Sequence, residues 1–122
     1  MSAHITQAIP ILPAIDIADS IVWWTEVCGF TVAFQHGGYA GLTRDGASVH
    51  LCEMSDPKLA RTVGDQTMIR FVVDDIDALY ADYKQRGGKV HPKGALQTKP
   101  WGTTEFASID PCGVCVTFLQ NS

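Results

Sequence analysis

The sequence is poor in charge and has no excess of basic residues. Charged residues make up 18% of its 122 positions, and 13 acidic side chains outnumber 9 basic ones. This balance argues against binding to a nucleic-acid backbone, where basic side chains must replace counterions. The low charge fits a dimer face, a ligand groove or chance variation, and the net charge of −4 would suit a cationic ligand.

Long apolar runs are also absent. The N-terminal stretch IPILPAI is too short to cross a bilayer and contains two prolines, and no basic segment precedes it as in a secretion signal. A chain of 122 residues that is 46% hydrophobic can bury one core. We therefore expect a single cytoplasmic domain over residues 1–122.

The cysteines do not form a zinc motif. Cys112 and Cys115 make one C-x-x-C pair, but a zinc ribbon needs a second pair, and Cys28 and Cys52 are far apart. The pair lies where the sequence predicts a turn entering a strand, whereas a redox pair is expected at a helix N-terminus. In the cytosol all four thiols are expected to be free. The sequence also contains no P-loop and no nucleophilic serine elbow.

The sequence does contain an internal repeat. Residues 9–30 and 68–88 match in kind when one is shifted by 59 positions. In each copy an apolar strand runs into an aspartate, an amphipathic helix follows, and a glycine ends the helix. Asp16 and Asp75 can cap these helices, because a carboxylate accepts the free N–H groups of the first turn. Each helix has apolar residues at helical spacing on one face: Ile17, Ile21, Trp24 and Cys28 in the first, and Ile76, Leu79, Tyr80 and Tyr83 in the second.

Strand-like sequence with turn signals follows each helix. Asp45-Gly46 separates two such runs in the first half, and Asp110-Pro111 separates two in the second. Each half therefore reads as a βαβββ module, at about residues 8–54 and 67–120, with a polar linker at about 55–66. The predicted fold class is α+β. One module has a single helix for its sheet, so it needs its twin or another chain to complete a core.

Two consecutive βαβββ modules resemble the vicinal oxygen chelate superfamily, which includes glyoxalase I and the bleomycin resistance proteins. The stretches ILPAIDIADSIVWWTEVCGF, YAGLTRDG and DDIDALYADYKQRG fit its pattern, and PWGTTEFASIDPCG is similar to the PWG-x-x-EFA-x-x-DP-x-G segment of the bleomycin-binding branch. The resemblance implies a curved, barrel-like mixed sheet and a domain-swapped homodimer. Cys112 and Val114 stand where the family usually has aspartate and asparagine, so the inference of ligand identity rests on few residues.

The resemblance also points to the positions where the superfamily's enzymes hold a divalent metal. Here these positions are Ile9, His50, Met68 and Thr117. A divalent ion needs several His, Glu or Gln side chains, and only His50 could serve. We therefore expect no metal, no cofactor and no catalysis, with His50 as a polar group in a groove. The alternative is a metal-dependent enzyme, similar to glyoxalases or dioxygenases, whose ligands fall outside this alignment.

The resemblance to the bleomycin-binding branch implies a groove at the dimer interface, where aromatic side chains hold the flat part of the drug. The matching positions are Phe34, Tyr39 and Trp101. Gly102 would let the Trp101 loop turn, and Glu105 would line the groove. Aromatic faces stack on flat and on cationic ligands. The sequence alone leaves open whether Trp101 faces such a groove or caps the sheet as part of the core.

Pro10 matches a proline that ends the N-terminal arm exchanged between partner chains in the bleomycin-binding proteins. Proline at this position fits an exchanged strand and also fits an ordinary edge strand. Together these observations predict a homodimer that sequesters a bleomycin-type antibiotic, a flat cationic glycopeptide, and so gives resistance without catalysis. Binding of another small aromatic metabolite is a further alternative. No nucleic-acid or membrane partner is expected.

Overall fold

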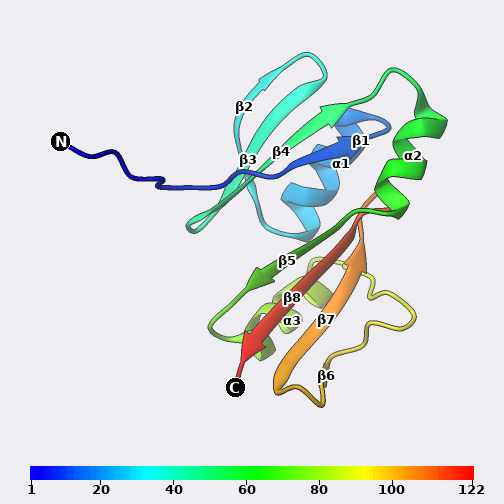
Figure 1. Cartoon of the computed structure of the whole chain (residues 1–122). Coiled ribbons are helices and arrows are strands. Elements are labelled where there is room, and N and C mark those ends of the chain that lie inside the picture. Colours follow the sequence, from blue (N-terminus) through cyan, green and yellow to red (C-terminus); the bar gives the residue numbers. More distant parts are fainter.

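The computed structural model describes all 122 residues and contains two four-stranded mixed sheets (Figure 1). The first sheet has the strand order β1-β4-β3-β2 and comprises β1 (Ile11–Ala14), β2 (Thr31–His36), β3 (Tyr39–Arg44) and β4 (Ala47–Glu53). The second has the order β5-β8-β7-β6 and comprises β5 (Met68–Val72), β6 (Gln97–Thr98), β7 (Thr103–Ile109) and β8 (Cys115–Asn121). In each sheet the first strand runs parallel to the last, and the other neighbours are antiparallel.

The helices occupy the predicted places in the repeat. Helix α1 (Ile17–Val22) continues as the π-helical turn η1 (Trp23–Val27) in the first module, and α3 (Ile76–Gln85) follows β5 in the second. Asp16 accepts hydrogen bonds from two backbone N–H groups of α1, and Asp75 accepts one from Ala78 of α3. The chain thus has the two tandem βαβββ modules of the vicinal oxygen chelate fold, and the predicted fold class is confirmed.

The register of the strands follows the repeat as well. In the first sheet Ile11 of β1 lies opposite His50 of β4, and in the second sheet Arg70 of β5 lies opposite Thr117 of β8. Ile11 and Arg70 are 59 positions apart, the shift that relates the two halves of the sequence. His50 and Thr117 are therefore equivalent positions in the two modules.

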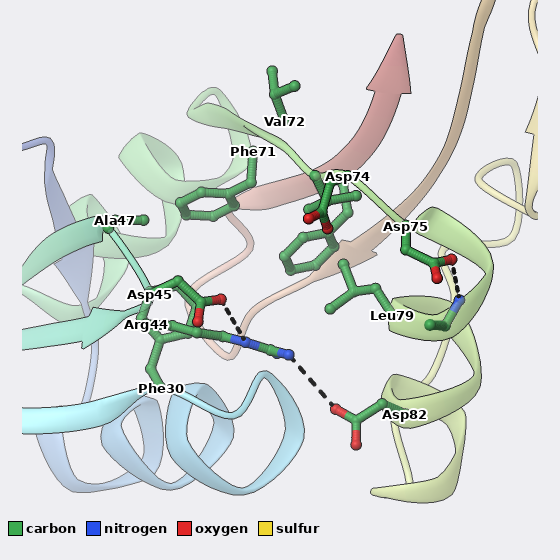
Figure 2. Close-up of a pocket in the computed structure, with 14 residues that line it drawn as sticks. Phe30, Arg44, Asp45, Ala47, Phe71, Val72, Asp74, Asp75, Leu79 and Asp82 are labelled. Atoms are coloured by element: carbon green, nitrogen blue, oxygen red, sulfur yellow. Dashed lines mark hydrogen bonds and ion pairs between the residues drawn. The ribbon is translucent and has the colours of Figure 1, made fainter. Parts of the chain in front are cut away.

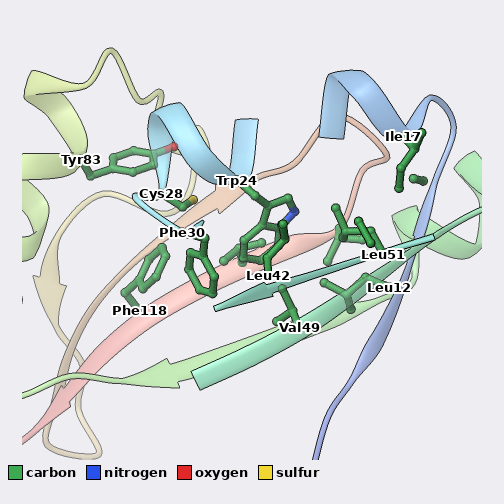
Figure 3. Close-up of a cluster of buried hydrophobic side chains, with 14 of the residues drawn as sticks. Leu12, Ile17, Trp24, Cys28, Phe30, Leu42, Val49, Leu51, Tyr83 and Phe118 are labelled. Atoms are coloured by element: carbon green, nitrogen blue, oxygen red, sulfur yellow. The ribbon is translucent and has the colours of Figure 1, made fainter. Parts of the chain in front are cut away.

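One hydrophobic core joins both modules on the sides of the sheets that face the helices. It contains 16 buried residues, among them Trp24 and Phe30 from the first module and Phe106 and Phe118 from the second. Figure 3 shows Trp24, Phe30 and Phe118 within this cluster. Trp24, Phe30 and Phe106 are all buried in this core. Burying a side chain of this size contributes roughly 1.5–3 kcal/mol. The twin module therefore supplies the cover that a single module lacks.

The segment between the modules forms a helix, which the sequence analysis treated only as a polar linker. Helix α2 (Pro57–Asp65) begins at the cap Asp56, whose carboxylate accepts hydrogen bonds from the backbone N–H groups of Lys58 and Leu59. It buries Ala60 and Gly64 and exposes the rest of its surface. The Sγ atom of Cys112 donates to the carbonyl of Ala60 over 3.2 Å. Helix α2 therefore packs against the turn between β7 and β8, which contains Cys112, and holds that turn in place.

The N-terminal arm, residues 1–9, is exposed along its whole length and extends away from the body of the molecule (Figure 1). Its one side-chain hydrogen bond to the body joins Gln7 Nε2 to Ser48 Oγ over 3.0 Å. The chain becomes fixed at Pro10, whose carbonyl accepts from the N–H of His50. No helix in the structure combines the length and the apolar character that a membrane span requires.

Candidate functional site

Three rings stand together on the face of the first sheet that is turned away from the core. Phe34 lies on β2, Tyr39 on β3 and His50 on β4, and we call this group the aromatic wall. The Phe34 and Tyr39 rings are stacked, with centroids 6.2 Å apart and an interplanar angle of 17°. His50 meets both rings edge-on at centroid distances of 5.3 Å. The structure therefore brings together three of the residues singled out by the sequence analysis.

The wall is held by local features of the sheet. Tyr39 Oη and His50 Nδ1 share a hydrogen bond of 2.7 Å, which fixes both rings. The Phe34 ring lies over Gly41, where any Cβ atom would collide with it. Phe34 nevertheless has 38% of its surface exposed. An exposed, ordered ring stack of this kind offers a flat contact surface at little cost in side-chain entropy. Sequence reasoning missed Gly41, although a glycine within a strand is a signal of close approach.

The residues at the superfamily's metal positions do not fit a divalent ion. His50 already uses one ring nitrogen in its bond to Tyr39. Ile9 and Met68 have no hard donor atom, and Thr117 has only a buried hydroxyl. No three His, Cys, Asp or Glu side chains gather anywhere in the chain in a metal-binding arrangement. Such a donor set cannot satisfy the coordination of a divalent metal.

Trp101 lies at the tip of the tight turn between β6 and β7. The N–H of Gly102 donates to the carbonyl of Lys99 over 2.9 Å, and Gly102 has a φ of 98°, which favours glycine. This geometry projects the indole outward and leaves Trp101 67% exposed. The possibility that Trp101 belongs to the core is therefore excluded. Nζ of Lys99 lies over the indole, 6.0 Å from the ring centroid.

Glu105 lies on the corresponding face of the second sheet and is paired there. Its carboxylate accepts from Arg70 Nη2 over 3.1 Å and from Thr103 Oγ1 over 2.7 Å. Burial alone would raise the pKa of Glu105, but the hydrogen bonds from Arg70 and Thr103 hold that pKa below its usual value. Arg70 reaches Glu105 across β8, the strand between them. Glu105 could be predicted from the sequence and Arg70 could not, because only the strand order makes them neighbours.

Asp110 and the cysteines have structural roles. Asp110 accepts from the N–H groups of Cys112 and Val114, each over 2.9 Å, which confirms the predicted turn. Burial raises the pKa of Asp110 above its ordinary range, against the hydrogen bonds from the turn. All four cysteines are free, and Cys112 is fully buried against α2. The C-x-x-C pair therefore closes a packed turn and does not form a disulfide.

The remaining predicted residues lie apart within one chain. The aromatic wall belongs to the first sheet, whereas Glu105 lies on the second sheet and Trp101 and Gly102 lie in the turn between its strands β6 and β7. No cavity of the single chain is lined by residues of both groups. Two large apolar side chains on the strands nearby are open to solvent, Ile11 at 61% and Met68 at 77%. Both side chains are free to contact a ligand or a second protein.

The paired βαβββ modules and the order of their strands define a protein of the vicinal oxygen chelate fold. The family model described as the Glyoxalase/Bleomycin resistance protein/Dioxygenase superfamily matches residues 2–118. The chain belongs to this superfamily, and the resemblance inferred from the sequence is confirmed.

Related proteins place the chain near the bleomycin branch of that superfamily. It is 32% identical to the bleomycin resistance protein of Geobacillus stearothermophilus, over 93% of this chain and 96% of that protein. It is similar in structure to a bleomycin resistance determinant encoded on the transposon Tn5, with a TM-score of 0.82 and 24% identity over 97% and 99% of the two chains. It is also similar to the bleomycin-binding protein of Streptomyces verticillus complexed with copper(II)-bleomycin, with a TM-score of 0.81 and 25% identity over 99% of each chain.

Proposed function

We propose that this protein binds and sequesters a bleomycin-type antibiotic and gives resistance without chemical turnover. The observation that supports this best is the aromatic wall, where Phe34 and Tyr39 are stacked and open to solvent. A flat heteroaromatic group can stack on such rings, and a cationic group is attracted to their faces. The names of the relatives, which include bleomycin resistance proteins, support the same ligand class.

We further propose that the groove forms between two copies of the chain. The aromatic wall of one copy would face the second sheet of the other, bringing Trp101, Gly102 and the Arg70–Glu105 pair to the opposite side of the ligand. Pro10 would be the hinge of an exchanged arm, because it is the first fixed residue after the exposed residues 1–9. The exposed Ile11 and Met68 side chains would then be covered. Domain swapping is a common route to such twofold dimers.

The proposal places the protein in the cytoplasm, which suits its four free thiols. It does not involve a metal or another cofactor of the protein, because the donor set at the superfamily's metal positions does not fit one. The competing proposal is a metal-dependent enzyme. Elemental analysis of protein purified without chelators distinguishes the two, since a stoichiometric divalent ion held by His50 would favour the enzyme.

Calorimetric titration with copper-loaded and metal-free bleomycin, against a panel of other antibiotics, tests the proposed ligand. Trp101→Ala should weaken bleomycin binding by about 1–3 kcal/mol, because the indole supplies a stacking surface. Leu59→Ala is a matched control, since Leu59 is 50% exposed on α2 and lies outside the proposed groove. Equal binding by Trp101→Ala and the parent protein would exclude the indole as a platform.

A further inference from the structure

A cavity lies at the junction of the two modules, on the core side of the sheets and away from the aromatic wall (Figure 2). Its volume is about 510 Å³, within the range of small-molecule sites. The β3–β4 hairpin borders it on one side, and β5 and α3 border it on the other. The function proposed above makes no use of this cavity.

The floor of the cavity is aromatic. Phe30, Phe71 and Phe118 form a continuous group, with ring centroids 5.7 Å apart for the first pair and 5.5 Å apart for the second. Phe30 and Phe118 are buried, while Phe71 and the neighbouring Leu79 are half-buried. A ring or short alkyl group could therefore lie against these side chains and lose its contact with water.

The rim of the cavity is acidic. Four carboxylates border it, those of Asp45, Asp74, Asp75 and Asp82, against the single guanidinium of Arg44. Such a rim surrounds the opening with a negative potential, and low-dielectric aromatic walls strengthen the field of the charges near them. The acidic rim and the aromatic floor thus favour the same kind of ligand, one with an apolar body and a positively charged end.

Most of these charged side chains already have hydrogen-bond or ion-pair partners within the chain. Arg44 donates to the carbonyl of Cys28 over 2.6 Å and lies 3.7 Å from Asp45 and 3.9 Å from Asp82. Asp82 also accepts from Nε of Arg86 over 2.9 Å, so a second guanidinium lies beside this part of the rim. The carboxylate of Asp75 caps α3. Asp74, which is exposed at the edge of the aromatic floor, has no such interaction in Figure 2. It is the carboxylate that a cationic guest could pair with at no cost to the fold.

We propose that this cavity is a second ligand site, which takes a small amphipathic cation: a protonated primary amine attached to an aromatic ring or a short alkyl group. The ring packs on Phe71 and Phe118, and the ammonium group pairs with Asp74 at the rim. The site is separate from the bleomycin site proposed above and does not depend on it, because the two lie on opposite sides of the sheets.

The test is a titration of the ¹⁵N-labelled full chain followed by NMR. 2-Phenylethylammonium is the probe, and 2-phenylethanol and phenylacetate are its neutral and anionic counterparts. The ammonium compound should bind most tightly, shift the amide signals of β5 and the start of α3, and lose affinity as salt is added. Equal affinity for the alcohol, or shifts confined to β2 and the β6–β7 turn, would overturn the proposal.

Two variants of equal charge complete the test. Asp74→Asn should weaken binding of 2-phenylethylammonium about two- to fivefold, as expected for a partly exposed ion pair. Asp77→Asn removes a carboxylate from the first turn of α3, three residues away and outside the cavity lining, and should leave the affinity unchanged. Identical effects of the two variants would count against the site. Trp101→Ala should bind the probe like the parent chain, whatever its effect on bleomycin.

Discussion

Glu105 shows how one paired side chain links the proposed groove to the stability of the second sheet. Glu105 is only 7% exposed, and its carboxylate is held by Arg70 and Thr103. Because these partners favour the charged form, the folded chain holds the pKa of Glu105 below its value in the unfolded chain. The resulting stability is present above the unfolded pKa and is lost as the pH falls through the folded pKa.

Replacing Glu105 by glutamine should therefore alter the acid side of the stability profile. Glu105→Gln should be less stable than the parent at neutral pH, and the difference should shrink as the pH falls below about 4.5. Urea unfolding of both proteins over a series of pH values measures this difference. The pKa of the buried Asp110 is shifted in the opposite direction, upward. Asp110 is present in both proteins, so it does not contribute to the difference between them. A pH-independent difference would mean that Glu105 acts through packing alone.

Among the secondary-structure elements, α2 is the one that is least well predicted from the sequence. The segment SDPKLARTVGDQT has few apolar residues, so its periodicity is weak, and most of its surface is exposed in the structure. A signal was nevertheless present, because Asp56 followed by Pro57 is a typical helix start. The burial of Gly64 could not be predicted, since it depends on the distant carbonyl of Cys112.

Gly64 should not tolerate a side chain. Alanine favours a helix over glycine by about 1 kcal/mol, but its Cβ would collide with the backbone carbonyl of Cys112. A backbone atom cannot move aside as a side chain can, and overpacking of this kind costs about 1–3 kcal/mol. Gly64→Ala should therefore lower the free energy of unfolding by up to about 2 kcal/mol net, measured by thermal or urea denaturation.

The control for this prediction is Thr62→Ala, on the exposed side of the same helix. It should be neutral or slightly stabilising, because alanine has the higher helix propensity and Thr62 bonds only to its own helix, through the carbonyl of Lys58. A stabilising effect of Gly64→Ala as well would show that α2 can move away from the last turn. The helix would then be a loose connector and not a brace.

The repeat explains why so much of the fold could be predicted from the sequence. Helix caps, glycine stops and the Asp45-Gly46 turn are local signals, and each appears at the predicted place. The turn also sets the register that puts Gly41 opposite His50. Contacts between distant strands had no such signal, and so the Arg70–Glu105 pair was not predicted. The aromatic wall is an intermediate case. Its residues could be predicted from the sequence, but the stacking of their rings could not.

At the scale of the whole molecule, the separation of the aromatic wall from Trp101 gives the proposed dimer a specific consequence. In one chain the two lie on different sheets and share no cavity. If they act on the same ligand, each groove must combine the wall of one copy with the indole of the other. A dimer then has two grooves, and each contains one first sheet and one second sheet from different chains.

This arrangement predicts complementation between two defective variants. Phe34→Ala and Trp101→Ala homodimers should each bind bleomycin weakly, since every groove has lost one ring. When the two variants are mixed, unfolded and refolded together, the heterodimer should contain one groove with both substitutions and one with neither. Calorimetry should then reveal a fraction of sites with the parent affinity, near half of the heterodimer's grooves. Sedimentation of differently tagged chains measures how much heterodimer has formed.

A site built within one chain gives the opposite result, because every chain in the mixture still has one substitution and no groove can recover. Mixing Phe34→Ala with Tyr39→Ala is the matched control. Both changes fall on the same wall, so every groove of their heterodimer remains defective. Recovery in the first mixture and none in the second would show that the ligand contacts both copies at once. Ligand binding would then depend on dimer formation as well as on the contacts within each groove.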